Sequence, residues 1–241
     1  VFFVISGYLI TSLILKEIRN NKFSIIKFYE RRARRILPAL FLVIFCTIPL
    51  AFIFLTRSEL GNFLKSIVAT SLFYSNIFFW KETPYFRSEA ELKPLLHAWS
   101  LSIEEQFYIL FPIFLIFLWR YKKEWIIHFL ILCLVASLFL AEWASIKTSN
   151  VGNFYFTLSR VWELAIGAIV AYYLINRNTE IISKNLSEFL VLVGFVAIIY
   201  SVFFYSRETR FPSFYALVPT LGTALIIVFA NPKTFVSKFL S

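Results

Sequence analysis

Long apolar runs separated by short polar stretches dominate the chain. Continuous runs of about 20 apolar residues match the thickness of a bilayer core and satisfy their backbone in lipid as helices. The runs are too long and too continuous for the strands of a membrane β-barrel. The pattern predicts an all-α polytopic integral membrane protein, a bundle of about seven to eight transmembrane helices in one domain, residues 1–241. The runs fall at about 1–15, 36–55, 60–80, 96–119, 125–145, 157–175, 188–205 and 214–230.

The run at 60–80 differs from the others because it carries several polar residues. If every run crosses the membrane, the basic stretches 16–35 and 120–124 fall on opposite sides, against the tendency of Lys and Arg to stay in the cytoplasm. The conflict disappears if run 60–80 is re-entrant or interfacial, with 56–95 on the outer side. Short loops often break the charge rule, so a crossing run stays an alternative. We expect loop 16–35 to be cytoplasmic.

Composition agrees with a membrane protein and narrows the partners. The chain is 59% apolar, where a soluble domain is about 45–50%. The net charge is +10, and much of the basic excess lies in loop 16–35. Nucleic acid is a poor partner for a chain that is otherwise lipid-soluble. The charge instead predicts contact with membrane lipids, anionic ones included, or with a phosphorylated substrate.

Four arginines within five residues precede the run that starts at Ile36. Their guanidinium groups repel one another and are tolerable where anions neutralise them. Arg32 and Arg35 are three residues apart, so on a helix they share a face and are placed to grip one phosphate. The alternative is a topology signal that contacts lipid headgroups. The four are Arg31, Arg32, Arg34 and Arg35.

The run at 96–119 opens with polar groups, although a charged group at membrane depth costs roughly 2.5–3.5 kcal/mol on insertion scales. On a helix, His97, Ser100, Glu104 and Tyr108 share a broad face, and Glu105 lies about 100° away. His is a general base, and Glu can orient it or carry a proton. The alternative places His97 and the two Glu inert at headgroup level.

A third polar group lies at the start of run 157–175. Arg160 and Glu163 are three residues apart, which favours an intrahelical ion pair. Gly167 and Ala171 are four apart, a small-residue pattern that allows close helix packing. The sequence has no Walker loop, dinucleotide fingerprint, HExxH motif or Cys/His cluster of metal spacing, so it predicts no metal site and disfavours ATPase, metalloprotease and cofactor-redox functions.

Five segments in order resemble the membrane acyltransferase-3 family, the bacterial O-acyltransferases that modify surface sugars. The resemblance spans the chain and is closest to the subgroup that carries a C-terminal SGNH-type domain. Its segments are VFFVISGYLIT at 1–11, FYERRARRILPAL at 28–40, PLLHAWSLSIEEQFYILFP at 94–112, SRVWELAIGAIVA at 159–171 and FPSFYALVPTLGTALII at 211–227.

The resemblance implies an acyl-CoA donor, usually acetyl-CoA, bound at the cytoplasmic face of the bacterial inner membrane. The acyl group passes to a hydroxyl of a glycan acceptor on the outer side. Arg32 and Arg35, helped by Arg31 and Arg34, would clamp the CoA phosphates. Glu105, with Glu104, His97 and Arg160, would complete the buried polar site that orients a catalytic His.

In the family that proposed His lies on the helix before VFFVISGYL. Because the chain starts without Met, we expect an internal segment that lacks this helix, the final helices and any SGNH-type domain, and that is inactive alone. A transporter or flippase for an anionic or lipid-linked glycan precursor remains an alternative, since intramembrane Glu and a basic entrance also suit proton-coupled movement. A third alternative is a membrane anchor with only structural polar residues. The acceptor is left open among lipopolysaccharide O-antigen, capsule, exopolysaccharide, peptidoglycan and a secreted antibiotic.

Overall fold

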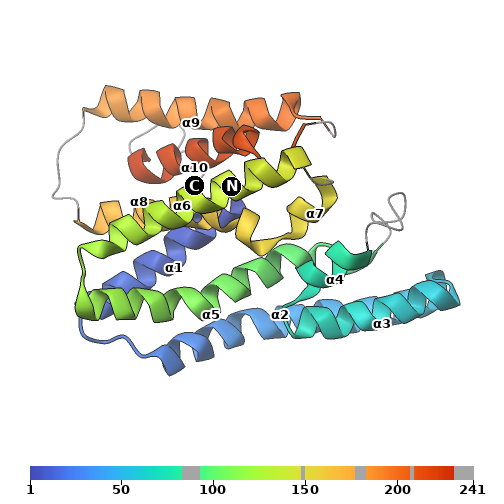
Figure 1. Ribbon diagram of the computed structural model, residues 1–241. Helices are drawn as coiled ribbons and strands as arrows, with labels where there is room; N and C mark the ends of the chain where they lie inside the picture. The colour runs from blue at the N-terminus through green and yellow to red at the C-terminus, as the bar shows by residue number, and fades with distance from the viewer. Residues whose placement is uncertain (83–92, 148–149, 177–182, 207–208, 231–241) are drawn as a thin grey trace. The chain divides into compact units, whose positions relative to one another are not determined.

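The computed structural model describes residues 1–82, 93–147, 150–176, 183–206 and 209–230 (Figure 1). The described residues form helices, short 3-10 turns and connections. The chain divides into two compact units, which interleave along the sequence. Unit 1 comprises Val1–Arg19, Leu115–Phe154 and Leu158–Ser241, and unit 2 comprises Asn20–Phe114 and Tyr155–Thr157.

Unit 1 is a set of apolar helices packed around a small core. Trp162 and Val4 are fully buried there, together with Ala141 and Ala216. Its elements are α1 (Phe2–Arg19), the last residues of α5, then α6 (Trp125–Lys147), most of α7 (Asn150–Tyr155), α8 (Val161–Asn176), α9 (Lys184–Phe204) and α10 (Leu217–Phe229), with the 3-10 turn η3 (Phe214–Ala216) just before α10.

Unit 2 is built on two long helices and two short ones. The long ones are α2 (Ile25–Phe54) and the first part of α5 (Ala98–Tyr121), and the short ones are α3 (Arg57–Ser71) and α4 (Ser75–Glu82). The Tyr29 hydroxyl donates a hydrogen bond to the Ile109 carbonyl at 2.8 Å, which fixes α2 against α5. The stretch at 155–157, which includes the start of the 3-10 turn η2 (Thr157–Ser159), completes the unit.

The apolar surface of the helices is that of a membrane protein. Within the described residues, α2, α5, α6 and α9 are long and apolar enough to cross a bilayer. Phe45 and Phe54 of α2 and Phe203 of α9 are more than 70% exposed. Large aromatic side chains at this exposure, on helices of this length, fit a lipid environment and not water. The predicted all-α polytopic membrane fold is confirmed.

The predicted close-packing face of α8 is confirmed, and its partner is α1. A Cβ atom added at Gly167 would lie 2.0 Å from the Val4 carbonyl oxygen, and one added at Gly7 would lie 2.1 Å from that of Leu164. Ala171 is fully buried in the same helix. The backbones of α1 and α8 therefore touch, which is the arrangement that small residues permit between membrane helices.

The polar run at 60–80 is not one helix. It is divided between α3 and α4 at residues 72–74, where Phe73 has a positive φ of 55°. Neither helix has the length of a membrane span on its own. This agrees with the expectation of a re-entrant or interfacial segment, while the placement of 56–95 on the outer side stays a prediction, and residues 83–92 lie outside the described part.

The expectation of a loop at 16–35 is wrong in its extent. α1 continues to Arg19 and α2 begins at Ile25, so the connection is residues 20–24 and the four arginines lie on a helix. Apolar Ile25, Ile26 and Phe28 allow the helix to start before the arginines. The helical spacing assumed for Arg32 and Arg35 therefore holds.

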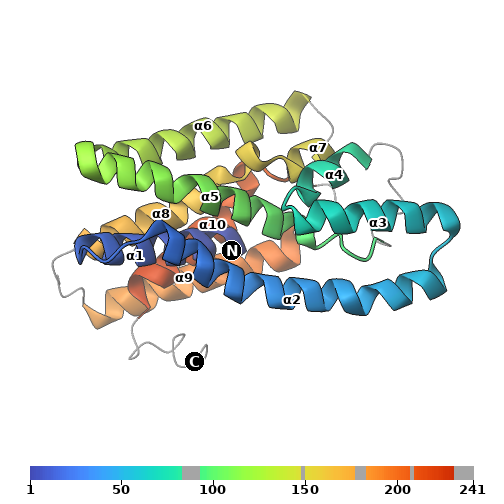
Figure 2. The same ribbon diagram turned by 90° about the horizontal axis from the view of Figure 1, so that it is seen from below.

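Two basic clusters share one end of unit 1. The Arg19 guanidinium donates to the Ile175 carbonyl at 3.1 Å, so α1 and α8 finish together. The turn between α5 and α6, which carries Lys122 and Lys123, lies at the same end in both views (Figures 1 and 2). This is the arrangement that the positive-inside tendency requires. Which face of the membrane this end meets stays a prediction.

Candidate functional site

Arg32 of α2 is set apart from the other arginines by its surroundings. Its guanidinium carbon lies 5.8 Å from the centre of the Phe28 ring and 5.4 Å from the centre of the Tyr108 ring on α5. The side chain is half-buried between these two helices. An aromatic face holds a guanidinium group by cation–π attraction while its N–H edge stays available to an anion.

The other three arginines of the cluster are exposed. Arg34 forms an exposed ion pair with Glu30 at 2.7 Å, one helical turn back. Arg35 follows Arg32 by three residues on α2 and interacts with it electrostatically, as like charges do. The structure thus separates one anchored arginine, Arg32, from three at the surface, and Arg35 is the one next to it on the same face.

Glu104 and Glu105 of α5 are buried beside Arg32. They are 5% and 8% exposed, and both interact electrostatically with Arg32. The Tyr108 hydroxyl donates a hydrogen bond to Glu104 at 3.3 Å. The structure therefore joins the arginine cluster, through Arg32, to an acidic pair that begins 72 positions further along the chain.

The Oε1 atom of Glu105 is buried and has no hydrogen-bond partner within the described residues. Leaving a buried polar atom unsatisfied costs about 1–3 kcal/mol, and more for a charged group. Buried polar atoms without a hydrogen-bond partner are rare in folded proteins, and a catalytic or ligand-binding role is one explanation for them. Glu105 is therefore the strongest candidate in unit 2 for a group that meets substrate or moves a proton.

The next residue, Gln106, has the opposite character because its amide is fully used. It donates to the Phe73 carbonyl and to the Asn76 side chain, both at 2.9 Å, and accepts from Thr157 at 2.6 Å. Asn76 in turn donates to the Tyr155 carbonyl at 3.1 Å. This network ties α4 and 155–157 to α5 and is structural.

Sequence reasoning missed this network. Asn76 was visible only as one polar residue of run 60–80, and Gln106 only as the residue after two glutamates. A second link of the same kind joins Ser75 and Ser102, whose hydroxyls lie 2.7 Å apart. Both links position α5, so Glu104 and Glu105 lie between two anchored residues of this helix, Ser102 and Gln106.

His97 lies in the turn just before α5 and is exposed. The backbone carbonyl of His97 accepts a hydrogen bond from Ser100 at 3.2 Å. The predicted shared helical face of His97 and Glu104 is therefore wrong, because the helix begins at Ala98. A catalytic part for the His97 side chain stays a prediction.

Arg160 lies in unit 1, and the predicted pair with Glu163 is confirmed. The two side chains are 2.6 Å apart, and the residues are 1% and 3% exposed. The Arg160 guanidinium carbon lies 4.7 Å from the centre of the Phe154 ring and 4.4 Å from that of Phe211. A charge this buried is tolerated because carboxylate and aromatic faces surround it. Its part in catalysis stays a prediction.

The arrangement in unit 2 supports acid–base chemistry next to an anion-binding group. Arg32 offers a fixed positive edge, and Glu105 offers a buried carboxylate oxygen that accepts no hydrogen bond from the residues the structure describes. Among the described residues no group of three or more His, Cys, Asp or Glu side chains is placed to hold a metal ion. The chemistry that these residues offer is orientation, charge stabilisation and proton transfer.

Comparison with known proteins identifies relatives over the whole chain. An uncharacterised protein of Haemophilus influenzae is 31% identical over 236 residues, which cover 94% of this chain and 96% of that protein. The O-acetyltransferase OatA of Staphylococcus aureus is 32% identical over 253 residues, and the peptidoglycan O-acetyltransferase OatA of Listeria monocytogenes is 29% identical over 255 residues.

Both OatA matches cover 100% of this chain but only 41% and 40% of the relatives' own length. No solved structure matches the chain significantly. The family model described as an acyltransferase domain matches residues 1–241. The family model thus matches this bundle of apolar helices from end to end. The chain belongs to the membrane acyltransferase-3 family.

Proposed function

We propose that the protein takes part in moving an acyl group, acetyl in the first instance, from acyl-CoA to a hydroxyl of a cell-surface glycan. The observation that carries the proposal is the joining of Arg32 to the buried pair Glu104 and Glu105, with an unsatisfied oxygen on Glu105. A cationic edge beside a free buried carboxylate suits a reaction in which an anionic donor is held and a hydroxyl loses its proton.

The donor side of the proposal rests on the arginines. The diphosphate and phosphate groups of CoA carry several negative charges, and guanidinium groups bind phosphate oxygens in pairs. Arg32 is oriented by Phe28 and Tyr108, so less side-chain freedom is lost when an anion binds. Arg35 extends the same face toward solvent, and Arg31 and Arg34 add charge.

The acceptor side rests on the relatives. The Listeria relative is called a peptidoglycan O-acetyltransferase, and the Staphylococcus relative an O-acetyltransferase. A cell-wall glycan is therefore the first acceptor to test for this protein. In the transfer the thioester C–S bond breaks, an oxygen ester forms, and the hydroxyl proton ends on the thiol of CoA. Glu105 would accept that proton on the way, or orient the His that does.

The proposal also includes the location and partners that follow from it. The protein would lie in the bacterial cytoplasmic membrane with residues 16–35 on the inner face, among membrane lipids. An SGNH-type domain in the whole protein would serve as the last carrier of the acyl group.

The test uses the full-length protein in proteoliposomes, with labelled acetyl-CoA outside and peptidoglycan fragments as acceptor. We expect label in an ester of the glycan, released by mild base, and a loss of transfer in Arg32→Ala. The control is Arg34→Ala, which removes an exposed arginine already paired with Glu30. If the glycan crosses the membrane unchanged and no ester forms with the parent or any variant, a transporter function replaces the proposed acyl transfer.

A further inference from the structure

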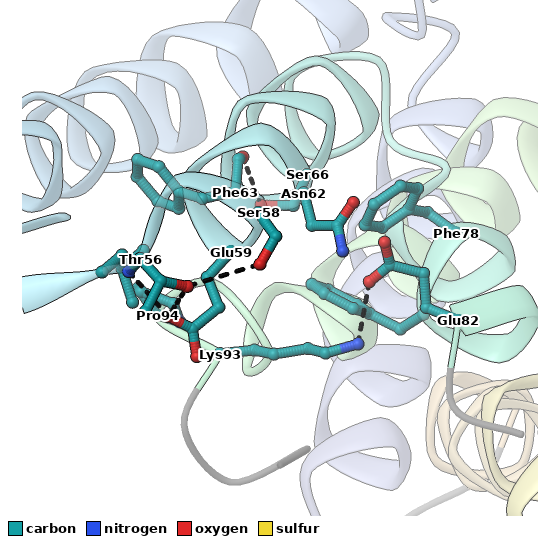
Figure 3. A pocket seen from close by; sticks show the side chains of 12 residues that line it. Thr56, Ser58, Glu59, Asn62, Phe63, Ser66, Phe78, Glu82, Lys93 and Pro94 are labelled. Atoms are coloured by element: carbon teal, nitrogen blue, oxygen red, sulfur yellow. Dashed lines mark hydrogen bonds and ion pairs between the residues drawn. The ribbon is translucent and has the colours of Figure 1, made fainter. Parts of the chain in front are cut away.

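Unit 2 contains a polar pocket that shares no lining residue with the Arg32 site. It has a volume of about 370 Å³ and lies between the end of α2, the helices α3 and α4, and residues 93–94 (Figure 3). A volume of this size is within the range of pockets that hold small ligands. Its wall combines aromatic and polar side chains: the aromatic ones are Phe63, Phe78 and Phe79, and the polar ones include Ser58, Glu59, Asn62, Glu82 and Lys93.

The charged groups in the wall are held in place by the protein. Lys93 forms an ion pair with Glu82 at 2.8 Å, and Glu59 accepts hydrogen bonds from the backbone and hydroxyl of Thr56 at 2.7 and 2.6 Å. These two bonds hold the pKa of Glu59 below its ordinary value, so it is ionised at neutral pH. Among the described lining residues, two carboxylates and one ammonium group give a net negative charge.

The remaining polar wall is available to a ligand. The Asn62 side chain reaches into the space between Phe78 and Ser58 (Figure 3), and its amide has no hydrogen-bond partner among the described residues. Phe78 is only half-buried, so part of its ring faces the pocket. The amide offers both donors and an acceptor, and the ring offers a flat apolar face.

The pocket and the arginine cluster lie at opposite ends of α2. At about 1.5 Å of rise per residue, Arg32 and Phe54 are about 33 Å apart along the helix. The hydrocarbon core of a bilayer is about 30 Å thick. A helix that crosses the membrane therefore places Arg32 at one face and the pocket, which starts at Leu55, at the other.

We propose that this pocket binds a sugar residue of the glycan acceptor. A pyranose ring has an apolar C–H face and a rim of hydroxyl groups, which matches the ring of Phe78 facing the Asn62 amide and the charged groups. The proposal rests on the proposed function, since that function requires an acceptor site on the face opposite the donor. It assigns the neutral sugar, and not the acyl-CoA, to this end of unit 2.

Two other occupants fit less well. Acyl-CoA would bring several phosphate charges against the excess carboxylate of the wall, which repels it. A lipid chain would leave the Asn62 amide without a polar partner and would bring apolar surface against the Glu82–Lys93 ion pair, both of which cost free energy. A neutral, hydroxyl-rich ligand satisfies the amide and the charged groups and covers the ring of Phe78.

The test is direct binding, measured without acyl-CoA. The full-length protein in nanodiscs is titrated by calorimetry with a tetramer of β-1,4-linked N-acetylglucosamine. We expect Asn62→Leu and Phe78→Ala each to weaken binding about tenfold, the scale of one lost good contact. The matched control is Asn185→Leu, the same change at an exposed position of α9 outside the pocket.

The outcomes separate this proposal from the proposed function. Weaker binding in both pocket variants, with unchanged binding in Asn185→Leu, supports a sugar site in this pocket, whether or not the protein transfers acetyl groups. Binding that is absent in the parent, or equal in the parent and Asn62→Leu, overturns it, even if acetyl transfer is intact. Because Asn62 is half-exposed, its replacement is expected to leave the unfolding temperature unchanged. Measuring that temperature shows whether the variant is folded.

Discussion

The Arg32 guanidinium carbon lies 5.4 Å from the centre of the Tyr108 ring, and the Tyr108 hydroxyl donates to Glu104. Tyr108 thus contacts the positive and the negative part of the candidate site at once. One face of the ring attracts the guanidinium group, and the hydroxyl at its edge fixes a carboxylate oxygen. The arrangement keeps Arg32 close to the acidic pair without using up its N–H groups on them.

Arg32→Lys tests whether this arrangement serves donor binding. Lysine keeps the charge but loses the planar fork and most of the aromatic contact. We expect the KM for acyl-CoA to rise about tenfold with little change in kcat, measured by initial rates in proteoliposomes at saturating acceptor. Arg34→Lys, at an exposed position, is expected to change the KM less than about twofold. Equal effects at both positions would mean that only total charge matters.

Glu105→Gln tests the unsatisfied carboxylate. Glutamine has nearly the same shape, so substrate binding is expected to persist while proton transfer is lost. We expect kcat to fall by about 100-fold or more with both KM values within about twofold. The measurement is steady-state transfer per folded enzyme, with the amount of folded protein set by size-exclusion chromatography. A Glu105→Gln variant with the parent's kcat would remove Glu105 from the reaction.

Gln106→Leu tests the neighbouring residue, for which we expect an effect on stability. The change removes the donor to the Asn76 side-chain oxygen and the acceptor of the Thr157 hydroxyl, while the Asn76 amide group still donates to the Tyr155 carbonyl. Each buried polar group left unsatisfied costs about 1–3 kcal/mol. We expect a clear drop in the unfolding temperature in detergent, together with a near-normal kcat for the protein that remains folded. Normal stability in this variant would show that the network is not needed to fix α5.

The helices could be predicted from sequence because apolar length alone decides where a membrane helix runs. The runs at 125–145 and 188–205 correspond to α6 and α9 within a few residues. The polar residues of run 60–80 indicated a re-entrant or interfacial segment, but its division into two helices was not predicted, because the break lies at a backbone conformation of Phe73 that no residue pattern indicates. The start of α2 before the arginines was missed because charge was taken as a sign of a loop.

The site could be predicted in its parts but not in its assembly. The arginine cluster and the acidic pair each stand out in the sequence, since charges beside or within apolar runs are costly. Their contact depends on how α2 and α5 pack, through the Tyr29 bond to Ile109, and no local pattern reports that. The Gly7–Leu164 contact was missed for the same reason, because only the Gly167 side of the crossing had a recognised spacing.

The Arg160–Glu163 pair yields a prediction that separates structure from catalysis. Glu163→Gln leaves a buried guanidinium group without its carboxylate, which is expected to cost about 3–5 kcal/mol. The double replacement Arg160→Met with Glu163→Leu removes both charges and is expected to recover most of that loss. If Arg160 is only structural, the double variant transfers acetyl groups at the parent's rate per folded protein. A stable double variant without activity would place Arg160 in the reaction.

Gly167→Ala tests the contact between α1 and α8. The added methyl group would lie 2.0 Å from the Val4 carbonyl oxygen, so the two backbones must move apart. We expect the free energy of unfolding to fall by at least about 2 kcal/mol, since overpacking against a rigid backbone has no side chain to give way.

Gly61→Ala is the matched control, because nothing lies within 4 Å of its added Cβ atom on α3. That change is expected to stabilise by about 0.5–1 kcal/mol through helix propensity alone. Both variants are compared with the parent by reversible unfolding in mixed detergent micelles. A lower free energy of unfolding in Gly167→Ala and a higher one in Gly61→Ala would show that the cost at Gly167 comes from the close contact of α1 and α8 and not from the loss of glycine. A Gly167→Ala protein as stable as the parent would mean that α1 and α8 do not pack this closely in the membrane.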